Sequence, residues 1–134
     1  MILVVCVDDN NGLMFNNRRV SSDKAVISDV ISFCNSRKIS VSPYSSSLFN
    51  GFESCIAVSN HCLDSQAEVC FAECGDFLQV KDSVDMLILY KWNRRYPSDL
   101  KFPVDLFISS MKLQSTQDFA GNSHPCITRE VYVR

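Results

Sequence analysis

The sequence predicts an α/β protein with a mostly parallel central sheet, an antiparallel edge at the C-terminus, and a few flanking helices. In the earlier part of the chain, short apolar runs typical of buried strands alternate with helical patterns, an order that favours parallel strands. From Lys112 onward the chain instead holds two strands of alternating polarity around a hairpin-like loop, which favours antiparallel pairing.

Length and composition indicate one globular domain covering residues 1–134, because 134 residues suffice for one core. The net charge of −2 gives no general attraction to nucleic acid or to an anionic membrane. No apolar run approaches the ~20 residues that span a bilayer. The N-terminal apolar run stops at Asp8 without a preceding basic segment, so we expect a strand there and no signal peptide. With seven cysteines, an odd number, we expect reduced thiols and a cytoplasmic protein.

The first elements follow from local patterns. Residues 2–7 predict a strand buried on both faces, and residues 8–12 a turn whose Asn-Gly pair supplies positive φ. Residues 13–20 are expected to be an irregular polar loop. A helix follows, and its apolar face is made by Val26, Ile27, Val30, Ile31 and Cys34.

The ends of this helix are predicted from caps and charges. Ser21 or Ser22 is expected to cap it, with Asp23 in its first turn. Arg37 and Lys38 are expected to close it, where cations complement the helix dipole.

The remaining elements are expected to be short. Strands are predicted at 39–41, 55–58, 69–72, 84–92, 112–116 and 127–133, with helical turns at 44–49 and 74–81. Residues 93–103 read as a polar connection. Residues 118–125 read as a solvated connector between the last two strands.

Two regions of the chain, residues 2–23 and 96–134, resemble dihydrofolate reductase. Residues 4–12 resemble that family's first strand and the start of its active-site loop. Residues 102–106, Phe-Pro-Val-Asp-Leu, resemble its "FP-x-x-D" step, and residues 127–134 resemble its closing "Y-x-R" strand. The resemblance implies the reductase fold and, in an active member, NADPH and a pterin substrate.

The resemblance also assigns an expected catalytic position. The family has an acidic residue at the start of its first helix, which holds the pterin ring and supports its protonation; Asp23 is the candidate here. A first-turn acid stabilised by the helix dipole is the alternative role. Where the family has Pro-Trp after its active-site loop, this chain has Arg18-Arg19.

The expected cofactor positions are substituted. The family's Gly-Arg-x-Thr segment corresponds to residues 42–45, Ser-Pro-Tyr-Ser, in which Ser45 keeps a hydroxyl but the arginine is missing. Of the family's Gly-Gly pair only Gly75 remains. The carboxylate of Glu73 is expected where a phosphate would pass, and like charges there disfavour binding.

Other chemistry finds weaker support. The two histidines, His61 and His124, are too far apart in sequence for a multi-histidine hydrolase motif, so we predict no metal. A loose cluster of His61, Cys62, Cys70 and Cys74 leaves a zinc site as a minor alternative. A thiol paired with His124 in space is a further open alternative.

Two basic clusters are candidate partner-binding sites. One is Arg18-Arg19. The other is residues 91–96, where Trp92, Arg94 and Arg95 are expected to be exposed. Arginine and tryptophan dominate interface energetics, whereas a strand end with Trp92 packed underneath is the alternative. A protein is the favoured partner, because no wider basic excess supports nucleic acid.

We therefore predict a non-catalytic protein on a reductase-like scaffold that binds a macromolecular partner as a regulator or inhibitor. A phage- or mobile-element-encoded antagonist of a host system is one form of this hypothesis, and it needs no cofactor. The alternative is a divergent NADPH-dependent reductase of pterin or dihydrofolate type, with Asp23 as its acid and Ser45 and Gly75 at the cofactor. A small-molecule binding module is a third class.

Overall fold

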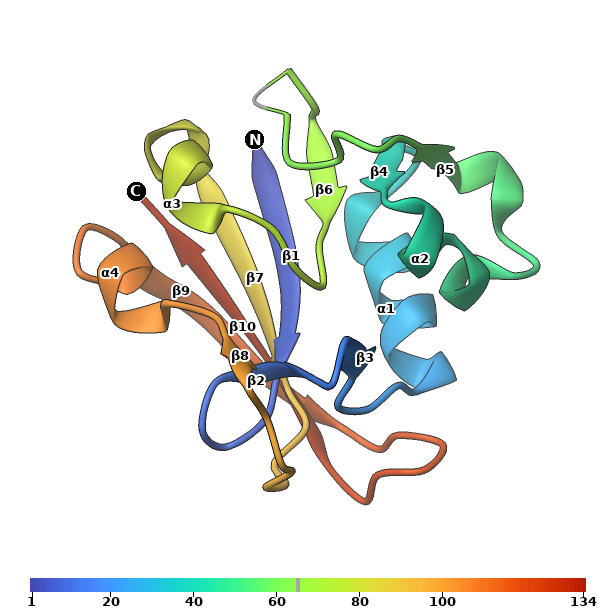
Figure 1. The fold of residues 1–134 in the computed structure, drawn as a ribbon, viewed down its shortest axis with the longest axis vertical. Coiled ribbons are helices and arrows are strands. Elements are labelled where there is room, and N and C mark those ends of the chain that lie inside the picture. Colours follow the sequence, from blue (N-terminus) through green and yellow to red (C-terminus); the bar gives the residue numbers. More distant parts are fainter. Residues whose placement is uncertain (65) are drawn as a thin grey trace.

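The computed structural model describes residues 1–64 and 66–134, and within them the strands form two sheets. The main sheet has seven strands among these residues, in the order β5 (Ile56–Val58), β4 (Ile39–Val41), β6 (Val69–Phe71), β1 (Ile2–Val7), β7 (Met86–Lys91), β10 (Ile127–Val133) and β9 (Lys112–Phe119). The strands from β5 to β7 run parallel, whereas β10 is antiparallel to β7 and to the edge strand β9. The predicted α/β class with an antiparallel C-terminal edge is confirmed (Figure 1).

The main sheet separates two apolar layers, because its central strands are apolar on both faces. Along β1, Leu3 and Val5 belong to one layer and Val4 to the other. The first layer is covered by α3 (Phe77–Val80) and α4 (Val104–Ile108), and the second by α1 (Lys24–Cys34) and the turns after it (Figure 1).

The small sheet corrects one prediction. Residues 13–20 are not an irregular loop: β2 (Gly12–Phe15) and β3 (Arg18–Arg19) form a hairpin, and β8 (Leu100–Lys101) pairs with β2 from within the predicted polar connection. The hairpin turns at Asn16 and Asn17, with φ values of 51° and 62°. Asparagine tolerates this left-handed region, which a two-residue hairpin loop needs.

The helix α1 has the predicted apolar face but different ends. Its N-cap is Asp23, not Ser21 or Ser22, and Asp23 therefore lies outside the first turn. The helix ends at Cys34, where Asn35 takes φ 44°. Arg37 and Lys38 thus lie beyond the last turn, although the Arg37 side chain donates to the Cys34 carbonyl at 3.4 Å.

The remaining short elements lie close to their predicted positions, although several of their bounds differ. The segment 44–49 contains α2 (Pro43–Ser46) and a 3₁₀ helix (Ser47–Phe49), and further 3₁₀ turns occupy Glu53–Cys55 and Lys81–Ser83. The strand β5 lies at a sheet edge and is largely exposed, not buried as predicted. No helix among the described residues is long and apolar enough to cross a membrane.

Candidate functional site

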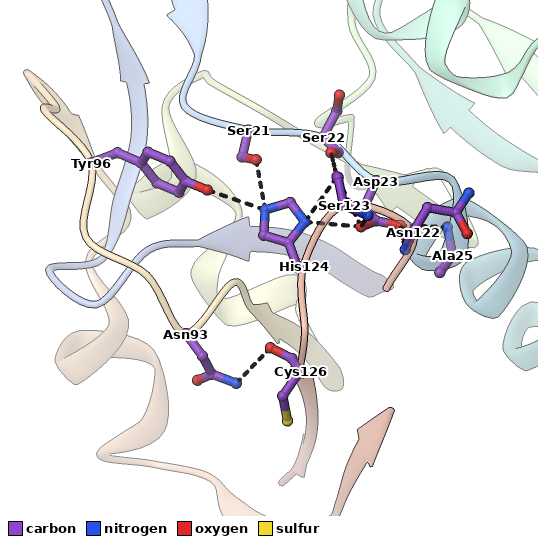
Figure 2. A network of polar contacts seen from close by, with 10 residues as sticks. All are labelled: Ser21, Ser22, Asp23, Ala25, Asn93, Tyr96, Asn122, Ser123, His124 and Cys126. Carbon is purple, nitrogen blue, oxygen red and sulfur yellow. Dashed lines mark hydrogen bonds and ion pairs between the residues drawn. The ribbon is translucent and has the colours of Figure 1, made fainter. Parts of the chain in front are cut away.

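The carboxylate of Asp23 is the centre of a buried polar network at the start of α1. Its Oδ1 accepts hydrogen bonds from the amides of Ala25 at 2.8 Å and Asn122 at 2.9 Å. Its Oδ2 accepts from the Ser123 amide at 2.9 Å and the Ser123 hydroxyl at 3.2 Å, and lies 2.9 Å from His124 Nδ1. The Asp23 side chain has no exposed surface. The β9–β10 loop is thereby joined to the first turn of α1 (Figure 2).

These contacts hold Asp23 in its ionised form. Burial on its own would raise the pKa of Asp23, because it removes the charge from water. The hydrogen bonds from Asn122, His124, Ser123 and Ala25 outweigh burial and lower the pKa of Asp23 well below its ordinary value.

The other ring nitrogen of His124 faces two hydroxyl groups. His124 Nε2 lies 2.9 Å from Ser21 Oγ and 3.1 Å from the Tyr96 hydroxyl (Figure 2). The imidazole is stacked on the Trp92 indole, with ring centroids 4.8 Å apart and planes at 25°, and only 2% of its side-chain surface is exposed. Ser21, His124 and Asp23 thus form a continuous hydroxyl–imidazole–carboxylate chain.

The position of His124 corrects the prediction that residues 118–125 are a solvated connector. His124 is buried, and its loop packs against Asp23. Gly121 allows this approach, because a Cβ at that position would lie 2.5 Å from Asp23 Oδ2. Glycine followed closely by histidine in a polar loop is the only local signal. The contact joins residues 101 apart, so no local pattern predicts it.

A second polar network surrounds Glu73, just after β6. The Arg19 guanidinium donates to both carboxylate oxygens, from Nε to Oε2 at 2.7 Å and from Nη2 to Oε1 at 3.0 Å. The Ser45 hydroxyl donates to Oε1 at 2.7 Å, and Ser45 is fully buried. Arg19 also lies 4.3 Å above the Tyr44 ring. The pKa of Arg19 is raised by its hydrogen bond to Glu73, so the guanidinium stays charged.

Comparison with solved structures identifies the architecture. The chain is similar to a structure described as dihydrofolate reductase from Enterococcus faecalis complexed with NADP(H) and RAB-propyl, with a TM-score of 0.66 over 99% of this chain and 95% of that one. The chain has the dihydrofolate reductase fold. The two sequences share 10% identity, so the likeness concerns the fold. No family model and no curated protein matches the sequence.

On the dihydrofolate reductase fold, the candidate cofactor residues of this chain make a poor fit to NADPH. The Ser45 hydroxyl is directed at Glu73, and the carboxylate of Glu73 would repel a phosphate. Gly75, at φ 132°, lies against the Leu63 side chain and lines a separate depression with His61 and Asp76. The structure therefore brings Ser45 to Glu73 and does not join Ser45 and Gly75 in one pocket.

Two spaces lie beside Asp23. The smaller, of about 20 Å³, is lined among others by Cys6, Ser21, Ile27 and Phe71. A single water needs about 10–15 Å³ on this measure, so the smaller space has room for one or two waters. The larger, an open depression of about 430 Å³, is lined by Asp23 together with Ser22, Ile27, Ser47 and Phe52.

The candidate partner-binding residues separate into three groups. Arg18, Arg94 and Arg95 are exposed, whereas Arg19 is half-buried and paired with Glu73. Trp92 is only 3% exposed, which corrects the expectation that it lies on the surface. Trp92 directly follows β7, and its apolar indole ring is buried against the His124 imidazole.

The candidate metal and thiol sites find no geometric support. Among the described residues, no group of three or more histidine, cysteine, aspartate or glutamate side chains is arranged to hold a metal ion. All seven cysteines are free, and the described polar partners of the His124 ring are oxygen atoms.

Proposed function

We propose that this protein carries out no hydride transfer and acts in the cytoplasm by binding a protein partner, as a regulator or inhibitor. The observation that supports the proposal is the Arg19–Glu73–Ser45 network, because Glu73, which the resemblance aligns with a phosphate position, is already paired with Arg19. A phosphate there would have to break a two-point ion pair and then face the freed carboxylate.

The exposed arginines supply the proposed contact surface. Arg18 stands on the β2–β3 hairpin opposite Phe15, which is itself 42% exposed. The segment of Arg94 and Arg95 is held in place by main-chain bonds, because the Asp9 amide donates to the Arg94 carbonyl at 2.9 Å. Arg18 beside an exposed apolar side chain, and Arg94 and Arg95 on a fixed segment, suit an acidic protein surface. Nucleic acid is less favoured, because the net charge is −2.

A titration with NADPH separates this proposal from the reductase alternative, in which Asp23, Ser45 and Gly75 serve catalysis and cofactor binding. We expect no rise in the thermal unfolding midpoint at millimolar NADPH or NADH. A binding cofactor at about a hundredfold over its dissociation constant would add about 2.7 kcal/mol. A cofactor-dependent rise in the midpoint would contradict the proposal and support the reductase. It would also reopen the class of small-molecule binding modules.

The partner surface is tested by affinity capture with matched charge variants. We expect the triple variant Arg18→Ala, Arg94→Ala, Arg95→Ala to lose a partner that the unmodified protein retains. The control removes three other exposed cations: Arg37, Lys38 and Lys112. Equal loss in both variants would indicate general charge attraction, and full retention in the first would contradict the proposed surface.

A further inference from the structure

We propose that Ser21, His124 and Asp23 form a nucleophilic triad that hydrolyses esters of small acyl groups. This activity does not rest on the proposed partner binding, because its residues are distinct from the exposed arginines. It carries no hydride and needs no cofactor. The observation behind it is the unbroken chain of contacts, from Ser21 Oγ to His124 Nε2 at 2.9 Å and from His124 Nδ1 to Asp23 Oδ2 at 2.9 Å.

The two buried members of the triad, Asp23 and His124, provide a positioned general base. Asp23 is ionised and accepts from the loop amides of Asn122 and Ser123, so it is held rigidly as an acceptor. A proton on His124 Nδ1 satisfies this acceptor, and the lone pair of the neutral ring then lies on Nε2, facing Ser21. Stacking on Trp92 holds the ring plane. A positioned histidine with an orienting carboxylate is the general base that a serine nucleophile requires.

The third member of the triad, Ser21, is the nucleophile. Ser21 is half-buried, whereas His124 and Asp23 are buried, so the serine is the triad residue that reaches the surface. Ser21 also lines the cavity of about 20 Å³, beside the apolar Ile27 and Phe71. The small size and apolar lining of this space favour a short acyl group, with the leaving alcohol on the solvent side.

The main-chain amide next to the nucleophile is the candidate donor to the developing oxyanion. The amide of Ser22, directly after the nucleophile, donates to no described residue. The amide that follows a serine nucleophile is a recurrent oxyanion donor in serine hydrolases.

The reaction balances with water alone. Ser21 Oγ forms a bond to the ester carbonyl carbon as its proton passes to His124 Nε2. The carbon–oxygen bond to the alcohol then breaks, and the leaving oxygen takes that proton. Water attacks the acyl-serine in the same way, losing one proton to Nε2. The released acid and the restored Ser21 hydroxyl complete the cycle.

Tyr96 provides a test specific to this geometry. Its hydroxyl competes with Ser21 for the single lone pair of His124 Nε2, at 3.1 Å against 2.9 Å. Removing the hydroxyl leaves Ser21 as the sole partner of Nε2. We therefore expect Tyr96→Phe to keep or raise the esterase rate, whereas a fall to the level of Ser21→Ala would overturn the assignment.

The decisive experiment combines a fluorophosphonate probe with hydrolysis of 4-nitrophenyl acetate. We expect the probe to label Ser21, located by mass spectrometry of the digested protein, and Ser21→Ala to lower the hydrolysis rate by about 100-fold or more. Ser32→Ala, an exposed serine of α1, is the matched control and should keep both.

Ser21→Ala removes a single half-buried hydroxyl, and an unchanged thermal midpoint will show that the variant is folded. If it is not, Ser21→Cys keeps a nucleophile and should give a burst of 4-nitrophenolate. Labelling at another residue, an unlabelled folded protein, or a wild-type rate in Ser21→Ala would each overturn the proposal. None of these results tests the proposed binding of a protein partner through Arg18, Arg94 and Arg95.

Discussion

At the scale of single residues, Asp23 is where sequence and structure differ most usefully. The sequence singles it out as an acid in the first turn of a helix, and in the structure it is the N-cap, one residue before that turn. The donors from Asn122, Ser123 and His124 come from 99–101 residues further along the chain. Such partners depend on the β9–β10 register, so local spacing contains no trace of them.

Protonation of Asp23 sets the first prediction, a loss of stability in acid. Its pKa is lowered in the folded protein, whereas the unfolded chain titrates near the ordinary value of about 3.9. Above the unfolded pKa, ionised Asp23 makes its full contribution to stability. As the pH falls from the unfolded pKa towards the folded pKa, the unfolded state takes up a proton that the folded state excludes. The free energy of unfolding therefore decreases.

Asp23→Asn should remove this contribution. At neutral pH the free energy of unfolding should fall by about 2 kcal/mol, because the amide oxygen of Asn replaces only one of the two carboxylate oxygens and leaves the donors on the other without an acceptor. Between pH 5 and 3 its urea midpoint should change less than that of the unmodified protein. Asp76→Asn is the control, since Asp76 is exposed and its side chain caps nothing. Parallel pH profiles for Asp23→Asn and the unmodified protein would contradict this role.

At the scale of elements, periodicity predicts α1 and the strands of the main sheet, because each buries a regular stripe of its own residues. It misses the small sheet, whose strands are short and whose β2–β8 pairing joins distant segments. It also places the end of α1 too late. The helix ends through a residue in the left-handed region, Asn35, and not through the basic residues beyond it.

The end of α1 sets the second prediction. Asn35 takes φ 44° and its amide donates to the Ile31 carbonyl at 3.2 Å. Glycine adopts this region without steric cost, so Asn35→Gly should raise the free energy of unfolding by about 0.5–1 kcal/mol. Asn50→Gly is the matched control, because φ at Asn50 is −58° and glycine there only adds freedom to the unfolded chain. Urea unfolding of both variants measures the two changes in free energy. Destabilisation by Asn35→Gly would contradict the left-handed conformation of Asn35 at the end of α1.

At the scale of the whole molecule, the two ends of the chain predict the fold, and the middle determines what the cleft contains. The first and last strands carry apolar patterns specific enough to resemble the reductase family, and the fold is confirmed over 99% of the chain. The contacts of Arg19 with Glu73 and of Trp92 with His124, beside the cleft, have no local sequence signal, because these side chains meet only after the strands associate.

The two apolar layers of the main sheet set the last prediction, that residues 1–134 unfold as a single domain. Both layers include side chains of β1 and β7, so neither retains its core when the other separates from the sheet. The chain contains a matched pair of reporters: Cys34 is buried in the α1 layer, and Cys70 in the layer of α3 and α4. Burial raises the pKa of Cys34 to about 11, and the hydrogen bond to Cys62, together with burial, raises the pKa of Cys70. Both thiols are therefore protected in the folded state.

Pulsed alkylation across a urea titration, read by mass spectrometry at each thiol, therefore measures the two layers independently. We expect Cys34 and Cys70 to become reactive with the same midpoint, while the exposed Cys126 reacts at every urea concentration. Earlier labelling of Cys34 would mean that α1 and its layer detach first. In that case the network that joins Asp23 to the β9–β10 loop would open before the sheet itself, and the chain would unfold in two parts.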